Sequence, residues 1–311
     1  MKKLEFEIED LKTSLEKALG FGLKSLTRVG GGGAANFKAE RGSDGLTFLV
    51  KCFPPDEREE FEYVAANLKA MEGAKVPERV FADECPDVFN GYFLLCQSWK
   101  PGEFINLATL TDGQWKAFVD DYLDLSRSMQ SVVPRGGVRP LREWRDAALA
   151  MCRGLVGRLL LPVLEAMDDD DLEFRPELRK VIHGDFHRGN ILFSEDRSAC
   201  FIDLESCRIG YSAEDIAVCC LNAYDVVSDN GCADRMLALF GLAVRRLPYS
   251  EHEWRTAFNS LFLNRLYRMT GGFRRLGLSQ GLKMRGISKV YESFRRRVDS
   301  AYRLKSAESV I

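Results

Sequence analysis

The sequence lacks the features that mark several classes of protein. Its nine cysteines form no CxxC pair and their number is odd, which argues against both a zinc site and a disulfide framework. We expect the cysteines to be reduced core residues. The most apolar stretch, residues 147–167, is interrupted by Arg153, Arg158 and Pro162, so no membrane span is predicted.

The start of the chain and its composition indicate an ordinary globular protein. The first residues lack the charged, apolar and small-residue pattern of a signal peptide, so we expect a cytoplasmic location. No internal repeat or low-complexity linker is present. Hydrophobic residues make up 46% and charged residues 29% of the 311 positions, as in most soluble domains. This length allows one large domain, or two smaller ones that share a cleft.

The net charge of −2 hides an uneven distribution. From Gly241 to the C-terminus the chain has fifteen Lys or Arg against five acids, so this part carries +10 and the rest −12. Such a basic segment can attract nucleic acid or an anionic membrane, and that remains an alternative. Because its arginines alternate with apolar residues at helical spacing, we favour a packed amphipathic face and expect no nucleic-acid partner.

The most informative stretch is residues 181–206, VIHGDFHRGNILFSEDRSACFIDLES. Its apolar and polar segments predict three short strands around a polar loop and a turn. Two of the chain's three histidines fall in that loop. The predicted order is a strand at 181–182, the loop at 183–190, a strand at 191–193, a turn at 195–198 and a strand at 200–202.

The last two of these strands are predicted to form an antiparallel hairpin. In the expected register Ser194 lies opposite Ala199, and Asn190 then lies opposite Asp203. The hairpin would thus present an amide and a carboxylate side by side, close in sequence to a second carboxylate, Asp185. Such hard oxygen ligands suit Mg²⁺, which takes one or two protein groups together with waters and substrate phosphates.

The spacing of the polar residues also matches a catalytic pattern, His-x-Asp-x-x-x-x-Asn followed by Asp at a strand end. The residues that fit it are His183, Asp185, Asn190 and Asp203. The stretch resembles the aminoglycoside phosphotransferase and choline kinase superfamily more closely than the protein kinases. Gly184 and His187 stand where protein kinases have Arg and Lys, and Ile-Asp-Leu-Glu replaces Asp-Phe-Gly.

The resemblance implies an α+β, bilobal, protein-kinase-like fold. Residues 1–100 would form a small nucleotide-binding lobe with a five-stranded antiparallel sheet and a helix. Residues 101–311 would form a larger, mostly helical lobe with the catalytic loop and the acceptor site. Strands are predicted at 23–29, 34–40, 46–53, 76–82 and 92–96, and helices at 7–19 and from Asp56 through an apolar stripe of Phe61, Val64, Leu68 and Met71.

The resemblance implies a Mg²⁺-dependent transfer of the γ-phosphoryl group of ATP to a hydroxyl group. Asp185 would accept or orient the hydroxyl proton, and His187 could approach the γ-phosphate. Asn190 and Asp203 would hold Mg²⁺. Three further residues would support them: His183 would brace the loop, Glu205 would bond a metal-bound water, and Asp215, near a helix N-terminus, would bond loop amides.

The N-terminal part contains the residues that the resemblance assigns to nucleotide binding. The run Gly30–Gly33 would let backbone N–H groups approach a phosphate. It resembles the GG…N nucleotide loop of the family, with Gly31 and Gly32 as the glycines and Asn36 in the Asn position. Lys51 lies on a strand among apolar neighbours, where burial is costly unless an anion meets it; it would hold the α- and β-phosphates.

Two further nucleotide contacts are expected. Helical geometry places Glu57 and Glu60 near the inward stripe of the helix after Pro55, and we expect Glu60, or else Glu57, to pair with Lys51. Adenine would bond to main-chain groups at the exit of the sheet, at Cys96 and Ser98.

The acceptor follows least directly from the sequence. Relatives phosphorylate aminoglycosides, choline or ethanolamine, sugars, homoserine and glycan units. A polycationic aminoglycoside favours an acid-lined pocket, whereas the helices expected to wall the acceptor site carry +10, so we expect an amino alcohol, a sugar or a glycan unit ahead of an aminoglycoside. The acidic run at 168–171 is expected to be a solvated turn. A non-catalytic ATP-binding scaffold with the same fold is the alternative.

Overall fold

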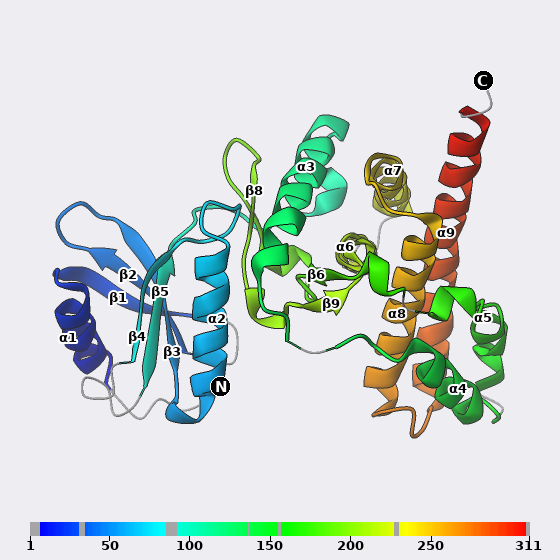
Figure 1. The fold of residues 1–311 in the computed structure, drawn as a ribbon, viewed down its shortest axis with the longest axis horizontal. Helices are drawn as coiled ribbons and strands as arrows, with labels where there is room; N and C mark the ends of the chain where they lie inside the picture. The colour runs from blue at the N-terminus through cyan, green and yellow to red at the C-terminus, as the bar shows by residue number, and fades with distance from the viewer. Residues whose placement is uncertain are drawn as a thin grey trace. The chain divides into compact units, whose positions relative to one another are not determined.

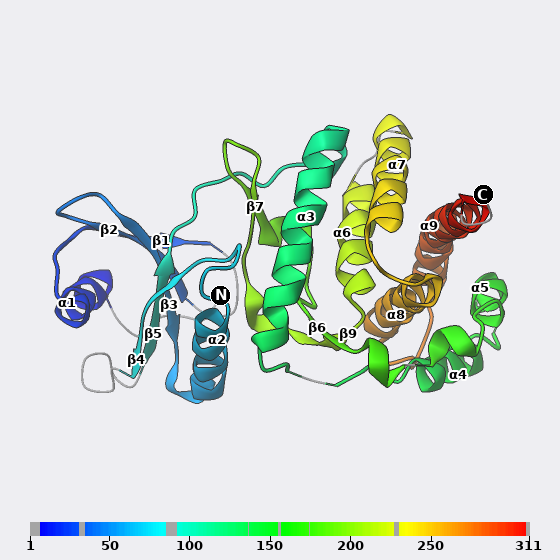
Figure 2. The ribbon, with the colours of Figure 1, turned by 45° about the horizontal axis from the view of Figure 1, so that its top comes forward.

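The computed structural model describes residues 7–30, 35–84, 92–135, 137–154, 157–173, 175–226 and 230–308. The chain forms two compact units, a sheet-rich one and a mostly helical one (Figures 1 and 2). The first comprises Met1–Glu103, Arg127–Val133 and Leu192–Glu205. The second comprises Phe104–Ser126, Pro134–Ile191 and Ser206–Ile311.

The first unit is built on a five-stranded antiparallel sheet with strand order β1-β2-β3-β5-β4. The strands are β1 Leu23–Val29, β2 Ala35–Arg41, β3 Thr47–Phe53, β4 Arg79–Glu84 and β5 Phe93–Ser98. One face of the sheet, which includes Phe37 and Val50, packs on Leu11 and Leu15 of α1 (Ile8–Leu19). The predicted sheet and its α+β fold class are confirmed.

Helix α2 (Arg58–Ala70) packs on β3, β4 and β5 through the predicted apolar stripe. Phe61 lies between Phe53 of β3 and Phe93 of β5, with ring centroids 5.9 and 5.2 Å away. Lys51 has the same parity in β3 as Phe53, and therefore its side chain leaves the sheet on the α2 face.

Strands β4 and β5 depart most from their predicted boundaries. β4 begins at Arg79 rather than at Val76, and Pro77, which has no N–H to give to a ladder, lies just before it. β5 continues past Cys96 to Ser98. There the backbone N–H of Ser98 donates to the C=O of Glu78 (2.8 Å), and the Ser98 hydroxyl accepts from the Glu78 N–H (2.9 Å).

The predicted hairpin forms from β7 (Ile191–Phe193) and β8 (Ala199–Phe201), but the predicted register is wrong by one residue at the turn. The N–H of Ser194 donates to the C=O of Ser198 (3.1 Å), one residue before the expected Ala199. The cause is Arg197, whose φ of 65° places it in the left-handed region and which forms a bulge after a tight turn.

The second unit is mostly helical, with one small sheet in which β6 (Lys180–Ile182) pairs antiparallel with β9 (Arg208–Gly210). Helix α8 packs on α6 and α9, and α7 packs on α6 and α9, as Figures 1 and 2 show. Aromatic residues such as Trp254, Phe258 and Phe294 fill the space between these helices. The helices are α3 Asp112–Ser128, α4 Leu141–Met151, α5 Leu161–Glu165, α6 Ser212–Val226, α7 Asn230–Arg246, α8 Glu251–Thr270 and α9 Leu278–Glu308.

A buried ionic cluster joins four elements of this unit around Glu214 of α6. The Glu214 carboxylate accepts from Arg208 of β9 (2.6 Å), from Arg139 (3.3 Å) and from the Ser260 hydroxyl of α8 (3.0 Å). Burial alone would raise the pKa of Glu214, but the two guanidinium groups outweigh it and lower the pKa. The cluster therefore fixes β9, α6 and α8 to one another.

The acidic run at 168–171 is only partly the solvated turn that was expected. Asp168, Asp169 and Asp170 are exposed, but Asp171 is buried. Its carboxylate lies 3.7 Å from Nδ1 of His252 and 3.9 Å from a guanidinium nitrogen of Arg255. The Asp171 carboxylate therefore packs against α8 and is not a surface charge.

The cysteines behave as predicted. All seven that the structure describes are free, and six of them are buried; the seventh, Cys200, is partly buried. Burial raises the pKa of the Cys207 thiol to about 12 and that of Cys200 to about 11. Within the described ranges, no helix has both the length and the apolar character needed to cross a membrane.

Candidate active site

The loop that follows β6 is held by a buried carboxylate from α6. Asp215 accepts the backbone N–H of His183 at 2.8 Å and that of Gly184 at 3.0 Å, and these are the contacts expected of it. Burial raises the pKa of Asp215 although both N–H groups favour the charged form. His183 is fully buried, with its ring against Phe186, and therefore anchors the loop.

Gly184 is required at its position. Its φ is +80°, and a Cβ there would lie 2.2 Å from the C=O of Ser206. Only glycine adopts this conformation without strain, and only glycine fits so close to another backbone. This close contact explains why the chain has glycine at position 184, where protein kinases have Arg.

Asp185, His187 and Asn190 lie close together in this loop. The Asn190 side-chain amide donates to the backbone C=O of Asp185 (2.9 Å), which leaves its oxygen for another partner. His187 accepts the N–H of Gly189 on Nδ1 (3.0 Å), so a neutral ring carries its proton on Nε2, 3.5 Å from the Asp185 carboxylate. The carboxylate of Asp185 is half-exposed and accessible to a substrate.

Lys51 forms a second group of polar residues, in the first unit. It is 8% exposed, and its ammonium group pairs with the carboxylates of Glu205 and Asp203, the latter at 3.4 Å. Burial alone would lower the pKa of Lys51, but the two carboxylates outweigh it and raise the pKa. One cation thus meets two anions, a combination with a surplus negative charge.

Asp203 has an unusual backbone. Its φ of 65° lies in the left-handed region, which few residues other than glycine adopt, although Asp tolerates it better than most. Strained residues of this kind concentrate at functional sites. Asn36, which was assigned to the nucleotide loop, lies directly opposite Lys51 in the β2–β3 ladder.

Sequence reasoning missed the pairing of Lys51 with Glu205. The two are 154 residues apart, and the expected partner was Glu60, or Glu57, on α2. Burial raises the pKa of Glu205, and repulsion by nearby Glu60 adds a smaller contribution in the same direction. The pairing of Glu60 with Lys51 stays a prediction. The cue in the sequence was the acid two residues after Asp203.

The other predicted nucleotide contacts have different outcomes. Gly31 and Gly32 lie outside the described residues. Ser98 and the buried Cys96 lie within β5, between β3 and β4. The N–H of Ser98 already bonds to the C=O of Glu78. The expected adenine contacts through main-chain groups of Cys96 and Ser98 stay predictions.

Comparison with known families identifies the chain. A model of the phosphotransferase enzyme family matches residues 25–252, which is well over half of the sequence. The chain belongs to the phosphotransferase enzyme family. No curated protein sequence matches it, so its relationship to this family rests on the family pattern and on structure.

Solved structures share the fold at low sequence identity. The phosphotransferase resembles amicoumacin kinase hAmiN, solved in complex with AMP-PNP, Ca²⁺ and Ami, with a TM-score of 0.61 and 12% identity over 94% of both chains. It resembles spectinomycin phosphotransferase APH(9)-Ia, solved with ADP and spectinomycin (TM-score 0.60, 11% identity, 96% and 98% of the chains). A third similar structure is an aminoglycoside phosphotransferase from Alicyclobacillus acidocaldarius (TM-score 0.59, 14% identity, 98% and 97% of the chains).

Asp203 and Asn190, the residues predicted to hold Mg²⁺, each have an oxygen of the kind that this ion takes. Mg²⁺ is held in proteins by one or two carboxylates or amides, with substrate phosphates and waters completing its shell. Asp203 supplies a partly exposed carboxylate beside Lys51, and Asn190 retains its amide oxygen. Within the described part of the chain, no group of three or more His, Cys, Asp or Glu could form a dedicated metal cage.

Proposed function

We propose that this phosphotransferase moves the γ-phosphoryl group of ATP, with Mg²⁺, to a hydroxyl group of a small molecule or glycan. The observation that supports it most is the Lys51 cluster: one buried ammonium group between Asp203 and Glu205. Burying an ammonium group is costly unless anions meet it, and the surplus negative charge of the two partly exposed carboxylates suits a divalent cation bound with the nucleotide. Lys51 itself would then hold the α- and β-phosphates.

In this proposal the His183–Asn190 loop and the Lys51 cluster act on the same nucleotide. One continuous segment, 183–205, carries the proton-accepting Asp185, Asn190 and the two acids of the cluster. Asn190 and Asp203 would bind Mg²⁺, which draws charge from the phosphates as the bond to the leaving group breaks. The first 100 residues would form the nucleotide lobe, and the remainder would carry the catalytic loop and acceptor site.

Within the loop, Asp185 would take the proton of the attacking hydroxyl. Its carboxylate is half-exposed, whereas its backbone is fixed by Asn190 and, through Gly184, by Asp215. A base that is rigidly held but open to solvent meets the positional requirement of general base catalysis. His187 lies beside this carboxylate, where its Nε2–H would orient Asp185 or meet a phosphate oxygen.

For the acceptor, we propose an amino alcohol, a sugar or a glycan unit ahead of an aminoglycoside. The support is the basic character of the chain after Gly241, which disfavours a polycation. The antibiotic ligands in the two similar kinase structures belong to those proteins.

A phosphorylation screen with MgATP tests the proposal. Amino alcohols, sugars, glycan fragments and kanamycin are each offered as acceptor, and ADP release is measured with and without acceptor. We expect acceptor-dependent turnover that falls by about 10²- to 10⁴-fold in Asp185→Asn, while ADP affinity is unchanged. Asp196→Asn, in the exposed hairpin turn, is the matched control and should retain full activity.

Two results would contradict the proposal. Nucleotide binding without turnover on any hydroxyl acceptor would instead support the ATP-binding scaffold. Saturable phosphorylation of kanamycin at low KM would overturn the order of acceptors while leaving the kinase activity in place.

A further inference from the structure

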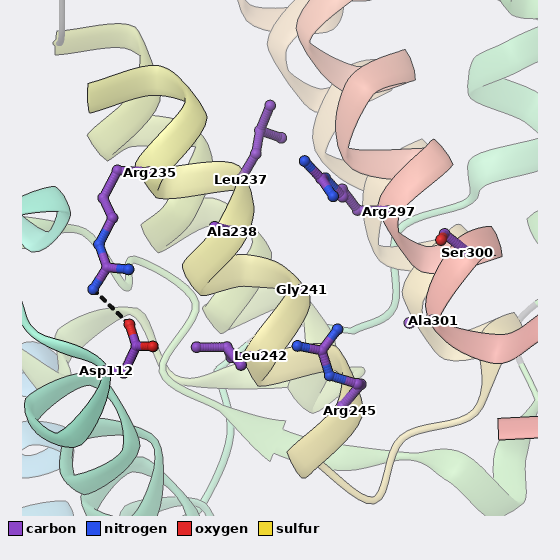
Figure 3. A pocket seen from close by; sticks show the side chains of 10 residues that line it. All are labelled: Asp112, Arg235, Leu237, Ala238, Gly241, Leu242, Arg245, Arg297, Ser300 and Ala301. Carbon is purple, nitrogen blue, oxygen red and sulfur yellow. Dashed lines mark ion pairs between the residues drawn. The ribbon is translucent and has the colours of Figure 1, made fainter. Parts of the chain in front are cut away.

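A basic groove lies in the second unit, between α7, α9 and the start of α3. It contains a pocket of about 230 Å³, which Figure 3 shows from close by. Its charged residues are Arg235 and Arg245 of α7, Arg297 of α9, and Asp112 of α3. The pocket shares no lining residue with the candidate active site, so the proposed function leaves it unexplained.

The one acid of the pocket is already neutralised. Asp112 pairs with Arg235 at 2.7 Å (dashed line in Figure 3), and Arg235 also donates to the C=O of Leu110 at 2.7 Å. Arg245 and Arg297, by contrast, have no carboxylate within 4 Å in the described part of the chain. Two guanidinium groups therefore remain uncompensated in one pocket.

The neighbours of these arginines show that carboxylates are available on the same surface. Arg246, next to Arg245, is held by Asp120 of α3 at 2.8 Å. Arg255 of α8 is held by Glu251 at 2.6 Å and by Asp299 of α9 at 3.1 Å. Arg246 and Arg255 are therefore paired with carboxylates, whereas Arg245 and Arg297 have no such partner among the described residues.

Some of the residues that line the pocket have small side chains. Gly241 lies beside the guanidinium of Arg245, because a Cβ on it would be 3.8 Å from Arg245 Nη1. Ala238, and Ala301 of α9, also line the pocket, and Ser300 adds a hydroxyl donor. These residues leave room next to the guanidinium groups, where a larger side chain would fill the space.

A second pocket, of about 450 Å³, continues the groove toward α3 and shares Asp112, Leu242 and Arg245 with the first. It is lined by Lys116 and by Trp115. Trp115 is 1% exposed, and its indole N–H has no acceptor among the described residues. A buried donor without an acceptor is uncommon. The charged residues that line the groove are therefore mostly cationic, with Asp112 as the one acid among them.

We propose that this groove binds a phosphate-type oxyanion, held by Arg245 and Arg297. Guanidinium groups bind phosphate oxygens with two parallel hydrogen bonds, and such charge-assisted bonds are among the strongest in proteins. The first pocket is smaller than the usual range of about 300 to 1,000 Å³ for drug-sized ligands, as expected for a small anion. The phosphate group would belong either to free phosphate or to a phosphomonoester.

Binding of inorganic phosphate to the full chain tests this inference, measured by calorimetry at constant ionic strength. We expect Arg245→Gln and Arg297→Gln each to weaken binding about tenfold, as the loss of one charge-assisted contact predicts. Arg296→Gln is the matched control: Arg296 is an exposed neighbour of Arg297 on α9 that does not line the pocket, and its variant should bind as the intact chain does.

A Lys51→Met variant separates this site from the proposed nucleotide site and should bind phosphate unchanged. Unchanged binding in both Arg245→Gln and Arg297→Gln, loss of binding in Lys51→Met, or equal heat with chloride would each overturn the inference. A parallel titration with glycerol phosphate identifies the source: tighter binding than phosphate indicates a phosphomonoester, and equal or weaker binding indicates free phosphate.

Discussion

Two ionic clusters in this chain have opposite balances of charge. Around Glu214 one carboxylate meets two guanidinium groups, and all three side chains are at most 15% exposed. Around Lys51 one ammonium group meets two carboxylates, and Asp203 and Glu205 are 39% and 29% exposed. The first cluster is sealed from solvent, which suits a structural role. The second is open and has surplus negative charge, which suits a bound cation.

The largest expected effect is the loss of activity when Lys51 is replaced. Lys51→Met should lower phosphoryl transfer about 100- to 1,000-fold, because it removes a positioned charge from the phosphates. The fold should persist, since methionine fills a similar volume between β-strand neighbours. Steady-state ADP release and a thermal melt measure the two effects. Lys24→Met, at an exposed position of β1, is the control; equal activity of both variants would contradict the assigned role.

The next effect concerns the sealed cluster. Glu214→Gln should lower the free energy of unfolding by about 3 to 5 kcal/mol, because it leaves two buried guanidinium groups without their carboxylate. Chemical denaturation with urea measures it. Glu205→Gln is the matched substitution in the open cluster and should cost far less stability. A larger loss of stability in Glu205→Gln than in Glu214→Gln would invert the comparison.

The stabilisation that Glu214 provides should depend on pH. The folded-state pKa of Glu214 is lowered from its ordinary 4.5 by Arg208 and Arg139, against the effect of burial. Its stabilisation is therefore complete above that ordinary value and is lost as the pH falls through the lower folded value. The stability gap between the wild type and Glu214→Gln should narrow from about pH 5 to about pH 3. A gap that stays constant over this range would exclude a titrating Glu214.

The smallest effect is expected at the edge of the sealed cluster. Ser260→Ala removes a hydroxyl that bonds Glu214 at 3.0 Å and Arg139 at 2.9 Å. Because both ions keep their mutual contact, unfolding should become easier by only about 1 kcal/mol, with activity per folded molecule unchanged. Thermal denaturation measures the change. A loss as large as that of Glu214→Gln would show that the hydroxyl is essential to the cluster.

The sequence predicted those parts of the fold that local patterns determine. The stripe of Phe61, Val64, Leu68 and Met71 is buried as its helical spacing indicates, and the five strands are present. The hairpin register was wrong because Arg197 adopts a positive φ that its residue type does not signal. Glycine or asparagine at that position would have indicated the bulge.

The candidate site was predictable where it is contiguous. Asp185, Asn190 and Asp203 fall in one motif whose spacing is itself the signal. The contact between Lys51 and Glu205 joins residues 154 positions apart, and no periodicity or local pattern encodes such a pairing. Charge balance explains it afterwards, because a buried lysine needs an anion, but several acids of the chain could have met that need.

The buried thiols have a practical consequence. The sheet-rich unit carries Cys52 and Cys96, and the helical unit carries Cys207, Cys219 and Cys220. A thiol reagent reacts only when the surrounding structure opens, because these thiols are buried and burial raises the pKa of Cys52, Cys207, Cys219 and Cys220. The rate of alkylation of each cysteine, followed by peptide mass spectrometry, would therefore report how fast each of the two units opens. The native cysteines serve as the labels, so none need be engineered.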